Sequence, residues 1–143
     1  MKHTVRILQI VVFGTLLLSI VSAQTAEPVV ARDSEEPLIF DVQQYNSSWI
    51  VGDTSGDGQT DYALKLDDQG QKKYEAVDYN NDGSMDNFYF YRNGVLHRQE
   101  LDTNHDGSVD LWIFMHDGVR VRAYHRDTNH DGTADLIREF GDA

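Results

Sequence analysis

From residue 38 onward, short apolar or aromatic runs alternate with turn signals, and one of the runs is apolar at every second position. That run is at 119–124, which reads Val-Arg-Val-Arg-Ala-Tyr. A period of two puts alternate side chains on opposite faces of a β-strand, so we expect one face on a core and one in water. Aromatic and β-branched residues, which favour strands, dominate the remaining runs, which are Tyr62–Leu66, Lys73–Val77, Phe88–Tyr91, Val95–Leu101 and Leu111–Met115.

The runs occur in pairs, and a glycine-containing turn signal lies between the two runs of each pair. The signals are Gln69-Gly70, Asn93-Gly94 and Asp117-Gly118. Asn-Gly and Asp-Gly between apolar runs are strong hairpin signals. We also expect an opening hairpin from Leu38–Val42 and Ser48–Val51, and a single closing strand at Leu136–Phe140.

A second turn-like segment, rich in aspartate, recurs at a fixed interval. The copies are DTSGDGQTD, DYNNDGSMD, DTNHDGSVD and DTNHDGTAD, and they begin at residues 53, 78, 102 and 127. Self-similarity at a period of about 20–50 residues marks a repeat architecture. The predicted fold class is therefore all-β, with antiparallel β-hairpin repeats of period about 24–25 joined by these loops. A closed barrel, a sandwich and an extended solenoid all remain open.

The loops place oxygen-bearing residues at positions 1, 3, 5, 7 and 9. Calcium takes about six to eight oxygen ligands at about 2.3–2.6 Å, and a glycine at position 6 permits the sharp backbone reversal that gathers them. Position 7 would contribute its backbone carbonyl. We therefore predict one Ca²⁺ in each loop. The predicted ligands are Asp53, Ser55, Asp57, Gln59 and Asp61; Asp78, Asn80, Asp82, Ser84 and Asp86; Asp102, Asn104, Asp106, Ser108 and Asp110; and Asp127, Asn129, Asp131, Thr133 and Asp135.

The alternative is that these segments are ordinary solvated turns, since Asp, Asn and Gly populate turns for conformational reasons alone. Repetition decides against it. The loops hold 12 of the 24 acidic residues at ligand spacing, including an aspartate at position 9 that turn chemistry does not require. The first loop departs most, with Ser55 in place of asparagine and an added glycine at Gly56, so we expect it to bind most weakly.

The loop pattern DxNxDGxxD resembles two known calcium loops. It is similar to the first half of the EF-hand loop, but the glutamate of that family at position 12 is replaced by Leu64, Tyr89, Ile113 and Arg138. With aspartate at position 9, it more closely resembles the loops of FG-GAP and VCBS repeats, where the loop joins β-strands. A propeller blade of that family carries one loop per four strands, whereas this chain carries one per two. The resemblance implies calcium loops between strands and no propeller.

The first 37 residues differ in composition from the rest. Lys2 and Arg6, an apolar run over 7–18 and a small-residue site at 21–23 predict a signal peptide over residues 1–23, and a secreted or periplasmic location. Residues 24–37 read as a flexible acidic linker, and 38–143 as the repeat domain. The formal charge is −12, and cleavage would make it −12 − 2 = −14. Such a surface excludes nucleic acid and, after cleavage, membrane as partners.

Other residues offer competing chemistry. His105 and His130 occupy position 4, where we expect the side chain to point away from the metal, and no histidines converge for a zinc site. Five aromatic residues would suit either a sugar-stacking platform or a core, and we favour the core; they are Tyr89, Tyr91, Trp112, Phe114 and Tyr124. No hydrolase, phosphate-loop or thiol motif is present, so we predict no enzyme and no catalytic residues.

Together, these patterns predict an exported protein that uses Ca²⁺ as a structural cofactor. The alternative is a calcium-dependent adhesion module that binds a carbohydrate or protein. An exposed patch of aromatic residues would favour the alternative, and a fully buried aromatic set would favour the purely structural role.

Overall fold

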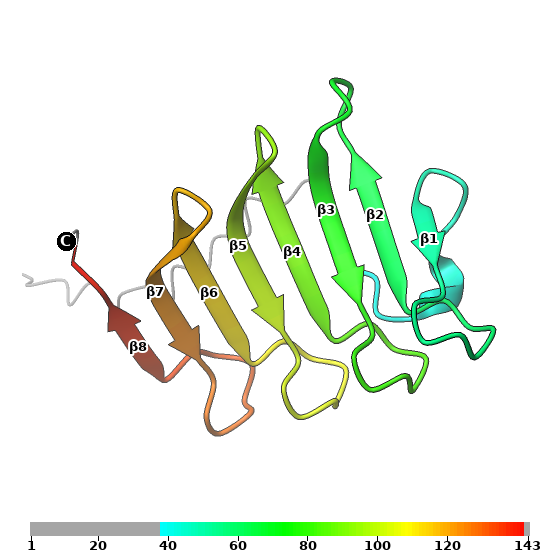
Figure 1. Cartoon of the computed structure of the whole chain (residues 1–143). Coiled ribbons are helices and arrows are strands. Elements are labelled where there is room, and N and C mark those ends of the chain that lie inside the picture. Colours follow the sequence, from blue (N-terminus) through cyan, green and yellow to red (C-terminus); the bar gives the residue numbers. More distant parts are fainter. Residues whose placement is uncertain (1–37, 142–143) are drawn as a thin grey trace, which may run out of the picture.

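The computed structural model describes residues 38–141, so the predicted signal peptide and linker lie outside the described residues. Eight strands form one antiparallel sheet whose spatial order follows the sequence (Figure 1), which confirms the all-β antiparallel prediction. They are β1 (Ile50–Gly52), β2 (Tyr62–Leu66), β3 (Lys72–Val77), β4 (Asn87–Arg92), β5 (Val95–Leu101), β6 (Leu111–His116), β7 (Arg120–Arg126) and β8 (Leu136–Glu139). β1 and β8 are its two edges, so the sheet is open.

Helix is nearly absent from this part of the chain. A short 3-10 helix, η1 (Val42–Gln44), precedes β1 and is capped by the Asp41 carboxylate, which accepts a bond from the Gln43 N–H. Among the described residues, no helix has the length and apolar character needed to cross a membrane.

The tight turns follow the predicted hairpin signals. Asn93 and Gly94 between β4 and β5 have φ of 51° and 72°, and Asp117 and Gly118 between β6 and β7 have φ of 53° and 73°. Two consecutive left-handed residues match the right-handed twist of the flanking strands, and this is why Asn-Gly and Asp-Gly are favoured there. The β2–β3 connection is longer. The Asp67 N–H closes it by donating a hydrogen bond to the Gln71 carbonyl at 2.8 Å.

One face of the sheet, which we call the core face, carries the apolar core. The strand register aligns Ala63, Ala76, Phe88 and Trp112 across this face. Residues 38–49 pack over its first half, where the Phe40 ring meets the Phe88 ring edge-on at 5.0 Å between centroids. Burying these aromatic rings removes a large apolar area from water and anchors the chain before β1 to the sheet.

A buried ion pair interrupts the apolar core face. Arg98 Nη2 lies 2.8 Å from Glu100 Oε1, and both side chains are almost fully buried. The Arg98 guanidinium also lies 4.4 Å from the centroid of the Phe90 ring. A buried pair contributes little net stability, but removal of one partner alone would be costly because the other charge would stay buried.

The opposite face, which we call the open face, has a different composition. Its central row reads Leu64, Glu75, Tyr89, Gln99, Ile113, Tyr124 and Arg138. The described side chains of this row are half-buried, apart from exposed Arg138. The five aromatic residues of the sequence prediction are therefore divided. Trp112 and Phe114 pack in the core as expected, whereas the prediction is wrong for Tyr89, Tyr91 and Tyr124, which lie on the open face.

The predicted opening hairpin is also wrong. Residues 38–42 do not pair with β1; instead the Met85 N–H donates to the Phe40 carbonyl at 2.6 Å, and Val42 N–H donates to the Gly83 carbonyl at 3.3 Å. The physical reason is that Val42 belongs to the core cluster and Phe40 packs against it, which removes apolar surface from water. The closing strand at Leu136 is confirmed as β8, paired with β7.

Candidate metal centre

The four aspartate-rich loops all lie at one end of the strands, and the tight turns lie at the opposite end (Figure 1). They connect β1 to β2, β3 to β4, β5 to β6 and β7 to β8. Adjacent strands are about 4.7–4.9 Å apart, and successive loops are two strands apart, so the loops form a row with a spacing of about 10 Å.

Position 1 organises each loop. Its carboxylate Oδ2 accepts a hydrogen bond from the position 6 N–H, at 2.8 Å for Asp53 and Gly58, 2.9 Å for Asp78 and Gly83, 2.8 Å for Asp102 and Gly107, and 2.7 Å for Asp127 and Gly132. These glycines have φ between 87° and 92°. The invariant glycine thus provides a backbone shape that a side chain would strain.

Position 9 closes each loop through a contact that the sequence reasoning missed. Its carboxylate accepts the N–H of position 2, for example Thr103 N–H to Asp110 at 2.9 Å. The position 2 threonine hydroxyl adds a second bond, at 2.6 Å from Thr103 to Asp110 and 2.7 Å from Thr128 to Asp135. The threonine at position 2, which three of the four loops share, was the sequence signal for this contact. The second loop has Tyr79 at that position instead.

Positions 3, 5 and 7 meet on the exposed side of each loop. The asparagine Nδ2 at position 3 donates to the position 5 carboxylate at 2.9 Å in the second and third loops and 3.1 Å in the fourth. In the first loop, Ser55 instead donates to Asp53, at 3.3 Å. The position 7 N–H donates to the position 5 carboxylate in every loop, from Gln59, Ser84, Ser108 and Thr133.

These contacts fill part of the hydrogen-bonding capacity of the predicted ligands. Within residues 38–141, no three acidic or imidazole side chains converge closely enough to hold a metal ion. The donor set of each loop nevertheless fits a hard cation, because it consists of carboxylate, amide, hydroxyl and carbonyl oxygens. For the asparagine to serve as a calcium ligand, its amide would have to turn so that the oxygen, in place of Nδ2, faces the ion.

Successive loops are joined to one another. The N–H of Asp78, Asp102 and Asp127 donates to the carbonyl of Asp61, Asp86 and Asp110, respectively, each at 2.9 Å. All six side chains are buried, whereas Asp53 and Asp135 at the two ends of the row are exposed. Packing of one loop against the next therefore removes the aspartates at each junction from solvent.

The pKa values of the loop carboxylates are shifted in opposite directions. Burial raises the pKa of Asp86, and the nearby Asp78 charge adds to the effect. Hydrogen bonds from the N–H groups of Gly58 and Gly56 lower the pKa of Asp53. Burial acts to raise the pKa of Asp127, but several N–H donors, that of Gly132 foremost, lower it overall. Backbone N–H donors therefore lower the pKa values of Asp53 and Asp127, whereas burial dominates at Asp86 and raises its pKa.

Both histidines at position 4 contact the preceding loop. His105 Nδ1 lies 3.6 Å from Asp86 Oδ2, and His130 Nδ1 lies 3.0 Å from Asn104 Nδ2. Their φ values of 59° and 58° are left-handed, as at the other position 4 residues. An open cavity of about 220 Å³ lies between the third and fourth loops, beside His130, Asp106 and Asp127.

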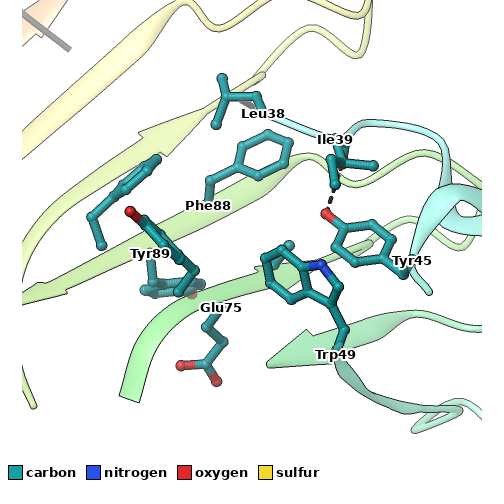
Figure 2. A pocket seen from close by; sticks show the side chains of 10 residues that line it. Leu38, Ile39, Tyr45, Trp49, Glu75, Phe88 and Tyr89 are labelled. Atoms are coloured by element: carbon teal, nitrogen blue, oxygen red, sulfur yellow. Dashed lines mark hydrogen bonds between the residues drawn. The ribbon is translucent and has the colours of Figure 1, made fainter. Parts of the chain in front are cut away.

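A second cavity lies under residues 38–49 on the core face (Figure 2). Leu38, Tyr45 and Trp49 cover Phe88 there, and the Tyr45 hydroxyl donates to the Ile39 carbonyl at 2.7 Å. Its volume of about 20 Å³ has room for about one water molecule. It is a packing gap between side chains, so it does not suit an organic ligand.

The comparisons with known proteins show no family for this chain. No family model matches it, and no curated protein matches it. A crystal structure of accessory secretory protein 1,2 and 3 in Streptococcus pneumoniae is similar over 73% of this chain and 20% of that chain, with 14% identity and a TM-score of 0.48. The crystal structure of TarM is similar over 64% of this chain and 19% of that chain, with 13% identity and a TM-score of 0.39. This chain spans about a fifth of each, and similarity this low transfers neither fold nor function.

Proposed function

We propose that this chain is an exported calcium-binding repeat protein, with one structural Ca²⁺ in each of its four loops. The observation that carries the proposal is the repetition of one loop geometry, in which the position 1 carboxylate is bound by the position 6 N–H at 2.7–2.9 Å. Shared backbone geometry with shared oxygen donors supports a common ligand. The exported location rests on the predicted signal peptide over residues 1–23.

Calcium would stabilise the sheet by neutralising the row of loops. Each loop holds three aspartates, and at each junction two of them are buried against the neighbouring loop, as with Asp86 and Asp102. Mutual repulsion of these carboxylates opposes the compact state, and a divalent ion within the loop reduces it. The role of the metal is therefore to hold the strand connections in place. No residue is assigned a catalytic role.

The test is calorimetric titration of the mature protein with CaCl₂. We expect about four sites per chain, with MgCl₂ competing poorly because Mg²⁺ demands near-octahedral geometry at about 2.0–2.1 Å. A variant with Gly107→Ala and Gly132→Ala keeps every predicted ligand but strains two loops, and should lose about two sites. A stoichiometry of zero or one in the unaltered protein would refute the proposal.

A second function, recognition of a protein or carbohydrate ligand, is favoured by one observation. The open face carries half-buried tyrosines that do not belong to the core cluster, and Tyr79 in the second loop has 63% of its surface exposed. This arrangement supports the alternative of a calcium-dependent adhesion module that binds a carbohydrate or protein.

A further inference from the structure

Glu75 in β3 lies on the open face with its side chain only 13% exposed. Figure 2 shows its carboxylate pointing away from Phe88 and the core face. The Tyr91 hydroxyl donates to Oε2 at 2.6 Å, and Lys72 Nζ donates to the same oxygen at 2.9 Å. The Tyr62 hydroxyl supplies a third hydrogen bond. Burial acts to raise the pKa of Glu75, but these three donors lower it overall, so the carboxylate is ionised at neutral pH.

Lys72 supplies a cation to this carboxylate. Its Nζ lies 5.5 Å from the centroid of the Tyr91 ring and 2.9 Å from Glu75, so the ammonium has both an aromatic face and a counter-ion. A cation within about 6 Å of an aromatic centroid is attracted by the ring quadrupole. The Lys72 side chain remains 44% exposed, which leaves it able to withdraw into solvent.

This group of residues departs from the repeat in which it sits. Positions equivalent to Lys72, counted from the following loop, hold Leu96 and Val121. Positions equivalent to Glu75 and Tyr91 hold uncharged or apolar side chains, namely Gln99 and Tyr124 for the first and Leu66 and Met115 for the second. The other repeats form the same strands without this acid, cation and phenol. The fold therefore does not require them, and departures from a local pattern are concentrated at functional sites.

The aromatic surface continues toward the second loop. The Tyr79 hydroxyl lies 2.8 Å from the Tyr89 hydroxyl, which also accepts a bond from Asn87 Nδ2 at 3.1 Å. Tyr79 occupies the position where the other loops have the threonine that binds the position 9 aspartate. The second loop thus exchanges an internal hydrogen bond for an exposed ring beside Tyr89.

We propose that Tyr62, Glu75, Tyr89 and Tyr91, which we call the Glu75 cluster, bind a lysine side chain of a basic polypeptide partner, with Lys72 as the internal occupant of the same place. Charge complementarity supports this partner, since the chain has a formal charge of −12 and an ionised carboxylate at the centre of the cluster. A neutral sugar is less suited, because a hydroxyl in place of the Lys72 ammonium would leave the largely buried Glu75 carboxylate without a counter-ion. Binding would exchange one ammonium for another and leave the Glu75 charge compensated throughout.

The test uses a tetralysine peptide as the probe, titrated into the ¹⁵N-labelled mature protein in millimolar calcium and followed by NMR. Lys72→Ala removes the internal competitor and should tighten the Kd at least threefold. Lys73→Ala is the matched control, because it makes the same charge change but its ammonium lies 5.2 Å from the ring of Tyr74 on the core face. We expect this control to change the Kd less than twofold.

Further arms separate the remaining explanations. Adding Glu75→Gln to Lys72→Ala should weaken tetralysine binding at least tenfold, while circular dichroism confirms that the sheet is retained. Equal effects of Lys72→Ala and Lys73→Ala would overturn the proposal, because they would indicate attraction to net charge alone. Shifts in the same amides with the neutral sugar cellotetraose, at lower concentration than tetralysine needs, would overturn it in favour of a glycan site. The calcium stoichiometry is a separate readout, so failure of one proposal does not imply failure of the other.

Discussion

The backbone N–H of Asp102 donates a 2.9 Å hydrogen bond to the carbonyl oxygen of Asp86, which holds the first residue of the third loop against the last residue of the second. The same bond joins Asp78 to Asp61 and Asp127 to Asp110. Each loop therefore forms part of the environment of the next, and the two ends of the row differ from its middle. This difference permits comparisons between chemically identical substitutions.

The first prediction compares two threonines at position 2. Thr103→Val removes a 2.6 Å bond to buried Asp110, and Thr128→Val removes a 2.7 Å bond to exposed Asp135. A bond to a buried charge is harder for water to replace. We expect Thr103→Val to lower the free energy of unfolding by about 1–2 kcal/mol and Thr128→Val by less than about 0.5 kcal/mol. Urea denaturation in calcium measures both, and equal losses would contradict the role of the junction.

The second prediction concerns the order of the loops. The first loop has Ser55 in place of asparagine, an added glycine at Gly56 and an exposed position 1 residue, so it should bind calcium most weakly. Asp57→Ala should therefore lower the melting temperature in millimolar calcium less than Asp106→Ala does. Both remove the same group from position 5, and the reverse ranking would refute the argument.

The third prediction is a dependence on pH. Because the folded pKa of Glu75 lies below its ordinary value, its contribution to stability is fully present above the unfolded pKa and is lost as pH falls through the folded pKa. The facing titratable groups on the neighbouring strands are Tyr62, Tyr89 and Tyr91, with Lys72 on the same strand. Burial together with Glu75 raises the pKa of Tyr62 to about 12, so that phenol stays protonated over this range.

The measurement is urea denaturation of the unaltered protein and Glu75→Gln between about pH 7 and pH 3. The difference in unfolding free energy should be largest near neutral pH and shrink toward the acid end, where the carboxyl is protonated. The comparison cancels the titration of the loop aspartates, which both proteins share. A difference that grows on acidification would contradict the assigned direction of the shift.

The sequence predicted the parts of this fold that depend on neighbouring residues. Runs of aromatic and β-branched residues located the strands, and Asn93-Gly94 and Asp117-Gly118 located two tight turns, because both signals act over a few residues. The alternation at 119–124 did not identify a core face, since Val119 and Val121 are exposed and only Ala123 is buried. The placement of Phe40 could not be predicted in this way, since it depends on contact with Phe88, 48 residues (88 − 40) further along the chain. Assigning Tyr89 to the open face likewise required the register of β4 with β3 and β5 and the burial of its neighbour Phe88.

The candidate site shows the same division. The left-handed glycines and the position 1 aspartates followed from loop chemistry alone. The bond of Thr103 to Asp110 was present in the repeated letters but not in the metal-ligand pattern, which assigns no role to position 2. The contacts of His105 and His130 with the preceding loop depend on how far apart neighbouring loops sit, which the sheet sets.

The last prediction is that removal of calcium loosens or unfolds the domain. Extracellular calcium modules have dissociation constants of about 10⁻⁴–10⁻³ M, so calcium at ten times that value adds roughly 1.4 kcal/mol per site. Four independent sites would add about 5–6 kcal/mol, which is comparable to the whole stability of a small domain at about 5–15 kcal/mol. In the chelated protein only N–H and hydroxyl hydrogen bonds would offset the charges of the buried aspartates at the junctions, so the empty loops should also repel one another.

Thermal melting of the mature protein in chelator and in a series of calcium concentrations measures this effect. For a domain of about 100 residues, 1 kcal/mol corresponds to roughly 4–8 °C, so saturating calcium should raise the melting temperature by about 20 °C or more. The midpoint should keep rising with calcium concentration above saturation, because the ion binds the folded chain alone. The same series in magnesium is the control for ionic strength, and it should give a much smaller rise. A melting temperature that chelator leaves unchanged would contradict the prediction. It would mean that the loops are stable without metal, because backbone N–H bonds alone would then stabilise the charges of Asp102 and its counterparts.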